Sequence, residues 1–302
     1  MELLYLLERI RIPVLNEFML LITRFGEETA FLVIALIVFW CIDKRKGYYI
    51  LSVGFVGTLV NQFMKLWFRI PRPWVLDENF TILEQAREAA SGYSFPSGHT
   101  QSAVGTFGAI AATTKNKWIR IAALFVAVAV PFSRMYVGVH TPLDVFVAAA
   151  TALLLIFILK PFILKEKKNS LGVILCIMSL MAVTFLCFVE FYSFPADIDQ
   201  HNLDSGYKNA YTLLGSLAGF IVVYIVDRKW INFSEKAVWW AQILKVVCGL
   251  AVVLAVKSGM KVPLNYLFGE SLGRAVRYFF VVISAGIVWP LSFKWFANLK
   301  SR

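Results

Sequence analysis

Three short clusters of polar residues interrupt an otherwise apolar chain of 302 residues, at positions 65–73, 96–99 and 133–144. Together they contain two of the three histidines and several of the lysines and arginines. Ionisable groups inside apolar sequence are costly to keep away from water, so they indicate a functional site when a partner can be named for them. Imidazoles and cations gathered in one place would be partnered by an anion. The expected chemistry is therefore the binding or transfer of an oxyanion.

Phosphate is the biological anion that needs several donors at once, and three cations of the clusters are suited to surround it: Lys65, Arg72 and Arg134. Arginine offers a planar fork for bidentate contact, whereas lysine acts as a mobile point charge. Ser97 and Gly98 begin a stretch that is expected to be helical, so their backbone N–H groups would add to the phosphate site. These five residues are the predicted phosphate ligands.

The third cluster ends in a pattern that predicts the start of a helix directly after His140. Thr141 is a natural N-cap, Pro142 suits the first helical position, and Asp144 falls where a capping-box acid belongs. Asp144 would accept the proton of one imidazole nitrogen and leave the other nitrogen of His140 as a nucleophile. His99 would then protonate the departing oxygen and later activate water. This division of roles requires the two imidazoles to have different pKa values.

The three clusters together resemble the signature of the type 2 phosphatidic acid phosphatase superfamily, which includes vanadium haloperoxidases and glucose-6-phosphatase. The matching patterns are K-x6-R-P at 65–73, P-S-G-H at 96–99 and S-R-x5-H-x3-D at 133–144. Each pattern alone is a weak signal, but all three in this order are specific. The resemblance covers residues 28–164, and no motif of the family is found in 165–302.

The resemblance implies a helical bundle, hydrolysis of a lipid phosphate or diphosphate, and no catalytic metal or cofactor. It assigns phosphate binding to Lys65, Arg72, Ser97, Gly98 and Arg134. It also assigns general acid and base catalysis to His99, and a phosphohistidine, supported by Asp144, to His140. The substrate class is that of phosphatidic acid, phosphatidylglycerol phosphate, undecaprenyl diphosphate or sphingoid phosphates, so the expected partners are a membrane lipid phosphate and the lipid bilayer.

The elements that must position these residues are membrane helices. Hydrophobic residues make up 59% of the chain, and a span needs about 20 mainly apolar residues. About nine windows are long enough or nearly so: 28–42, 48–67, 98–114, 118–136, 142–164, 171–192, 207–227, 238–257 and 275–297. The predicted fold is an all-α polytopic bundle with a phosphatase core of five or six spans and three or four further C-terminal spans. The expected parts are an amphipathic interfacial segment at 1–27, the phosphatase core at 28–164, and C-terminal helices of unknown role at 165–302.

The charge pattern predicts the orientation of the chain. The formal net charge is +11, but the cations are dispersed among short loops instead of forming one stripe, which argues against a nucleic-acid partner. Cytoplasmic loops are enriched in lysine and arginine. The residues that fall on that side are Lys44, Arg45, Lys46, Lys115, Lys117, Arg120, Lys165, Lys167, Lys168, Arg228, Lys229, Lys236, Lys300 and Arg302. The three polar clusters then face the extracytoplasmic side, and the plasma membrane is the expected location.

Several alternative interpretations remain at this stage. The cations at span ends are also typical of anchors that reach lipid headgroups, and Arg69 is interpreted in this way. His201 is interpreted as part of a solvated acidic loop. Gly215 and Gly219 form a G-x-x-x-G pattern that suits either helix packing or a homodimer. The alternative functions are a phosphotransferase with the same covalent step, a transporter or scaffold with a decayed site, and, more remotely, a haloperoxidase.

Overall fold

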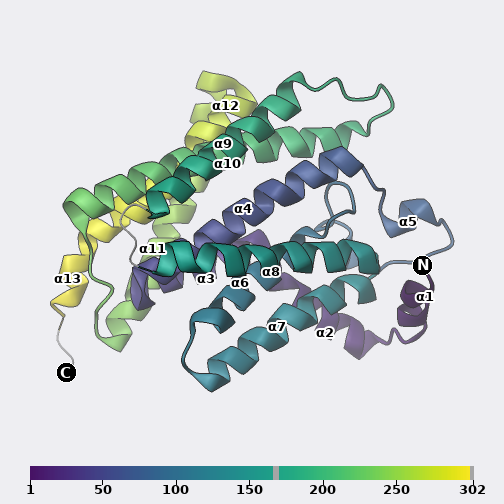
Figure 1. The fold of residues 1–302 in the computed structure, drawn as a ribbon, viewed down its shortest axis with the longest axis horizontal. Coiled ribbons are helices and arrows are strands. Elements are labelled where there is room, and N and C mark those ends of the chain that lie inside the picture. The colour runs from purple at the N-terminus through teal and green to yellow at the C-terminus, as the bar shows by residue number, and fades with distance from the viewer. Residues whose placement is uncertain (166–169, 300–302) are drawn as a thin grey trace. The chain divides into compact units, whose positions relative to one another are not determined.

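The computed structural model describes residues 1–165 and 170–299, and every regular element in these ranges is a helix (Figure 1). The all-α prediction is therefore confirmed. Of the cations predicted on the cytoplasmic side, Lys167, Lys168, Lys300 and Arg302 lie outside the described residues. Contacts divide the chain into two compact units. The first contains residues 1–34, 49–165 and 195–206, and the second contains 35–48, 166–194 and 207–302.

The first unit contains all three polar clusters. Its helices are α1 (Glu2–Arg9), α2 (Pro13–Arg24), most of α3 (Glu28–Ile37), most of α4 (Lys44–Phe68), α5 (Pro73–Leu76), η2 (Glu84–Ala86), α6 (Gly98–Thr113), α7 (Lys117–Tyr136) and α8 (Pro142–Leu164). Local caps explain where two of them begin. The Ser97 hydroxyl accepts a hydrogen bond from the Thr100 amide, and Thr141 with Asp144 forms the predicted capping box. Both helix starts expected from the sequence are confirmed.

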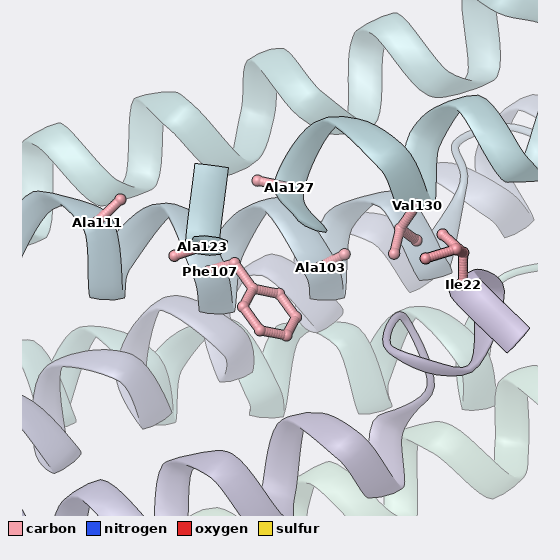
Figure 2. Packing of buried hydrophobic residues seen from close by; sticks show 7 residues of the cluster. All are labelled: Ile22, Ala103, Phe107, Ala111, Ala123, Ala127 and Val130. Atoms are coloured by element: carbon pink, nitrogen blue, oxygen red, sulfur yellow. The ribbon is translucent and has the colours of Figure 1, made fainter. Parts of the chain in front are cut away.

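Small side chains let α6 and α7 pack closely in the core of this unit. Figure 2 shows a buried cluster to which α6, α7 and α2 all contribute. Its members are Ile22, Ala103, Phe107, Ala111, Ala123, Ala127 and Val130. Four alanines allow the two backbones to approach, which is the usual way to pack helices where lipid removes the hydrophobic driving force. The core therefore fixes α6, α7 and the N-terminal α2 as one block.

The helix directions bring the polar clusters to one end of the first unit. α6 packs against both α7 and α8, and short connections make α6 antiparallel to α7 and α7 antiparallel to α8. The beginnings of α6 and α8 therefore lie at the same end as the end of α7. The last turns of α4 join them, because Lys65 and Asn61 reach the segment before α6. Lys117, at the start of α7, and Lys165, directly after α8, therefore lie at the opposite end of the first unit.

Seven helices in the described ranges are long and apolar enough to cross a membrane, or eight if the bent pair Pro13–Arg24 and Glu28–Ile42 forms one span. This number is below the nine windows expected from the sequence. The window at 98–114 forms α6, but with 16 residues it is shorter than a full span. The window at 28–42 forms only the second half of the bent pair, Glu28–Ile42.

The second unit contains α9 (Ser170–Phe191), most of α10 (Gln200–Val226), α11 (Trp239–Gly259), α12 (Lys261–Ile283) and α13 (Phe293–Ala297). Shorter segments complete it: η1 (Val38–Ile42), η3 (Asp227–Ile231), η4 (Ser284–Val288) and η5 (Trp289–Ser292). The window at 275–297 starts too late, since α12 already begins at Lys261 and passes a kink at Gly269, where φ is 76°. Only glycine adopts that value without strain.

The G-x-x-x-G pattern packs α10 against α12 within the chain. A Cβ atom added to Gly215 would collide with the carbonyl oxygen of Ala275, and one on Gly219 would lie 2.9 Å from the carbonyl oxygen of Phe279. The pattern thus serves helix packing inside the second unit, and the homodimer stays a prediction.

Candidate active site

Arg72 joins the first polar cluster to the third and to the segment before the second. Its Nε donates to the carbonyl oxygen of Gly92 at 3.0 Å, and Nη2 donates to that of Ser91 at 2.8 Å. Nη1 donates to the carbonyl oxygen of Val139 at 3.0 Å. The side chain is buried, and among the described residues none of its hydrogen bonds goes to a carboxylate. Its positive charge therefore stays available to an anion.

Lys65 and Asn61 lie one turn apart on α4 and face the same backbone segment. The Lys65 ammonium donates to the carbonyl oxygen of Tyr93, and the Asn61 amide donates to that of Pro96 at 3.2 Å. Both side chains are buried. Sequence reasoning identified Lys65 and missed Asn61, although its spacing of one helical turn from Lys65 offered a signal.

His140 lies between Arg72 and Asp144. Arg72 Nη1 is 2.9 Å from His140 Nε2, and His140 Nδ1 is 3.4 Å from Asp144 Oδ2. Arg72 Nη1 also lies 3.4 Å from His140 Nδ1, so it stands beside the imidazole ring, close to both of its nitrogens. A proton on Nδ1 would face Asp144, although the distance from Nδ1 to Oδ2 is longer than an ordinary N–H···O bond. With the proton on Nδ1, Nε2 would carry the lone pair.

Ser94 is a site residue that sequence reasoning missed. Its hydroxyl donates to Asp144 Oδ2 at 2.6 Å, and the Thr141 amide donates to the same oxygen at 2.7 Å. The Ser94 Oγ also lies 3.5 Å from His140 Nδ1. Two donors hold the carboxylate beside the imidazole, which restricts its orientation. The only hint in the sequence was a hydroxyl two residues before the P-S-G-H pattern.

We expect Ser94→Ala to lower kcat about tenfold, because a hydrogen bond to a charged acceptor contributes roughly 1.5 kcal/mol or more. Phosphate release by the purified variant would measure the effect. Ser91→Ala is the matched control, since the Ser91 side chain is exposed and only its carbonyl contacts Arg72. Equal kcat values for the two variants would refute the role of the Ser94 hydroxyl.

The start of α6 supplies Ser97, Gly98 and His99. The Ser97 amide donates to the Asp144 carbonyl at 3.1 Å, which ties this turn to the start of α8. The Ser97 hydroxyl is used as the helix cap. His99 Nε2 is buried and has no hydrogen-bond partner among the described residues. A hydrogen bond with an oxygen of the substrate would satisfy this nitrogen.

Arg134 is completely buried at the end of α7. Its Nη1 donates to the Thr23 hydroxyl at 2.7 Å, while Nε and Nη2 have no partner within the described ranges. The neighbouring Ser133 hydroxyl bonds back to the Val130 carbonyl at 2.7 Å and does not reach the site. Thr23, 111 residues away in sequence, had no signal that could have revealed it.

Both histidines are within the electrostatic reach of all three cations. Burial lowers the pKa of His140 well below its ordinary value, and the charges of Arg72, Arg134 and Lys65 lower it further. Burial and the same three charges lower the pKa of His99. The three cations thus act on both imidazoles, and their positive charge favours an anion. His201 is exposed, and the described ranges hold no group of three or more His, Cys, Asp or Glu residues that could hold a metal ion.

A multi-spanning helical protein with two imidazoles and three buried cations at one end of a bundle has the features of a membrane phosphatase, and the comparisons with known proteins agree. Residues 45–168 match the PAP2 superfamily, and residues 211–302 match the transmembrane extension of PAP2 superfamily phosphatases. The chain belongs to the PAP2 superfamily.

Two similar proteins come from Bacillus subtilis and one from Sulfolobus acidocaldarius. The B. subtilis phosphatidylglycerophosphatase B is 33% identical in an alignment of 172 positions that covers 53% of this chain and 80% of that protein. The S. acidocaldarius undecaprenyl-diphosphatase is 30% identical over 48% of this chain and 68% of its own length. The B. subtilis undecaprenyl-diphosphatase BcrC is 29% identical over 50% and 79%, respectively. No solved structure matches the chain significantly.

Proposed function

We propose that this membrane lipid phosphatase hydrolyses a lipid phosphate or diphosphate through a phosphohistidine formed on His140 Nε2. One observation carries the proposal: Arg72 Nη1 lies 2.9 Å from His140 Nε2, so a cation suited to a phosphoryl oxygen stands next to the proposed attacking nitrogen. When substrate binds, Arg72 Nη1 donates to a phosphoryl oxygen, while Nε and Nη2 keep their carbonyl partners. Arg72 thereby holds the phosphorus atom of the substrate close to the attacking nitrogen of His140.

In the first step, Nε2 attacks phosphorus, the N–P bond forms, and the bond from phosphorus to the leaving lipid oxygen breaks. His99 gives its proton to that oxygen. Burial and the nearby cations favour neutral His99, and the negative charge of the bound substrate offsets this effect. Lys65, Arg72 and Arg134 stabilise the charge that spreads over the phosphoryl oxygens. Asp144 stabilises the positive charge that develops on His140.

In the second step, neutral His99 takes a proton from water, whose oxygen attacks phosphorus. The N–P bond breaks, inorganic phosphate leaves, and Nε2 of His140 regains its lone pair. The backbone N–H of Gly98 holds a phosphoryl oxygen through both steps, whereas the Ser97 N–H, also expected to do so, already donates to the Asp144 carbonyl. No metal or cofactor is needed, because the three side-chain cations supply the positive charge.

The substrate class is inferred from the similar proteins, whose names specify phosphatidylglycerol phosphate and undecaprenyl diphosphate. Both kinds of molecule combine a phosphate headgroup with a long apolar tail. A tail in the bilayer and a headgroup at the end of α4, α6, α7 and α8 would account for a polar site at one end of apolar helices. Monophosphates and diphosphates of lipids are therefore both candidates.

The proposed location is the plasma membrane, with the site on the extracytoplasmic side. The support is that Lys117 and Lys165 lie at the end of the first unit opposite to the site, and cytoplasmic loops are enriched in such cations. The proposed parts remain an N-terminal segment at 1–27, a phosphatase core at 28–164 and a C-terminal extension at 165–302.

The test is phosphate release by the purified protein from a panel of polyprenyl diphosphate, phosphatidylglycerol phosphate, phosphatidic acid and a sphingoid phosphate, with EDTA present. Inorganic phosphate from at least one lipid, with competitive inhibition by vanadate, is the expected result. Transfer of the phosphoryl group to an added alcohol, with no free phosphate, would indicate a phosphotransferase instead. Loss of activity in EDTA that magnesium restores would refute the metal-independent mechanism.

A further inference from the structure

The N-terminal segment is fastened to the end of α7 that carries Arg134. The Tyr136 hydroxyl donates to Asn16 Oδ1 at 2.8 Å, and Arg11 Nε donates to the Tyr136 carbonyl at 3.0 Å. Met19, Ile22 and Thr23 are the buried residues of α2. Since α2 packs on α7, this segment is not held to the rest of the first unit by apolar contacts alone. It also makes directional hydrogen bonds next to a phosphate ligand.

The contact between Thr23 and Arg134 determines which edge of the guanidinium is free. The Thr23 hydroxyl accepts from Nη1 at 2.7 Å. The Nε and Nη2 atoms remain buried without a partner among the residues described. These two nitrogens form one side of the planar group, and their N–H bonds run parallel, as bidentate contact with an oxyanion requires. Thr23 thus occupies one end of the guanidinium and leaves the bidentate edge unused.

The turn after α2 also lies against His99, the proposed general acid and base. A Cβ atom added to Gly26 would lie 2.9 Å from the His99 carbonyl oxygen and 3.0 Å from His99 Cβ. The backbone at Gly26 therefore packs directly on the residue that carries the imidazole. α2 and its following turn contact two site residues that come from two different helices, α6 and α7.

We propose that Thr23 is a positioning residue for phosphate binding, which holds Arg134 Nη1 so that the Nε and Nη2 edge is presented to the phosphoryl group. This role rests on the proposed function and extends the site beyond residues 45–168, the range that matches the PAP2 superfamily. An arginine that makes no such contact would lose orientational entropy on binding phosphate. Thr23 removes part of that cost before the substrate arrives.

The experiment compares Thr23→Val, Thr23→Ser and wild type with a water-soluble, short-chain lipid phosphate, which avoids dilution of substrate in micelles. KM, kcat, the inhibition constant of vanadate and Tm are measured for each protein. Valine keeps the shape of threonine and removes the hydroxyl, so we expect KM and the vanadate inhibition constant to rise about tenfold, the lower range for a hydrogen bond to a charged group. Serine keeps the hydroxyl and should restore both values to within about threefold of wild type.

Thr29→Val is the matched control, because Thr29 is exposed on α3 and undergoes the same change of side chain. It should behave as wild type in all four measurements. If Thr23→Val is not recovered as folded protein, Thr23→Ala takes its place in the comparison with serine. A variant without the hydroxyl that has a lower Tm but an unchanged vanadate inhibition constant would overturn the proposal, since a packing role alone predicts that result.

The outcomes separate this inference from the proposed function. If wild type releases phosphate and His140→Ala does not, while removal of the Thr23 hydroxyl changes neither KM nor vanadate inhibition, only the role of Thr23 is refuted. If wild type releases no phosphate from any lipid of the panel, the proposed function fails, and the role of Thr23 fails with it.

Discussion

Replacing His140 by alanine is expected to lower turnover by several orders of magnitude, on the order of 10⁴ to 10⁶, because this residue supplies the atom that bonds to phosphorus. His140 is 1% exposed, so water has little room to replace the imidazole in its place. Phosphate release per mole of folded protein measures the loss. Rapid quenching with labelled substrate at alkaline pH should leave label on wild type and none on the variant.

His201→Ala is the matched control for this experiment. His201 is exposed at the start of α10, and its carbonyl oxygen, not its ring, accepts a hydrogen bond from the Ser205 hydroxyl. The control should keep wild-type turnover. Turnover of His140→Ala at the level of this control would remove the covalent mechanism and favour a scaffold or transporter with a decayed site.

The second large effect is expected for Arg72→Lys, which should lower kcat/KM on the order of 10² to 10³. Lysine keeps the charge but lacks the planar fork. It cannot bond to the carbonyls of Ser91 and Gly92 and also contact a phosphoryl oxygen beside His140. The loss would therefore appear in both substrate turnover and the inhibition constant of vanadate.

Arg69→Lys is the control for the arginine substitution. Arg69 is partly exposed, and its guanidinium donates to the Leu66 carbonyl, at 3.4 Å. Its kinetics should match wild type, in agreement with its interpretation as an anchor. If Arg72→Lys also matched wild type, with unchanged vanadate inhibition, a phosphate-binding fork at this position would be ruled out.

The features that the sequence predicted well are those determined by neighbouring residues. A hydroxyl at Ser97 and the sequence from Thr141 to Asp144 produce helix caps within three residues, and both caps form. Long apolar windows likewise became helices, because a backbone in lipid must satisfy its own hydrogen bonds. The order of the polar clusters along antiparallel helices was enough to predict that they meet at one end.

The features that the sequence did not reveal depend on contacts between distant residues. Ser94 and Asp144 are 50 residues apart, and Thr23 and Arg134 are 111 apart. A lone serine or threonine in an apolar stretch carries no local pattern that names its partner. The start of the helix before Gly269 was missed for a different reason, since a glycine followed by an acidic residue resembles a loop rather than a kink.

Lys65 and Arg72 donate to main-chain carbonyl oxygens, and this affects how the enzyme would respond to inorganic phosphate, its product. These two cations are neutralised only partially, because main-chain oxygens carry partial charge. A doubly charged counter-ion therefore relieves mutual repulsion whether or not a lipid is attached to it. Free orthophosphate qualifies as such a counter-ion, so we expect the electrostatics that attract the headgroup to cause end-product inhibition as well. Its throughput in the cell would then follow the ambient phosphate concentration on its own side of the bilayer.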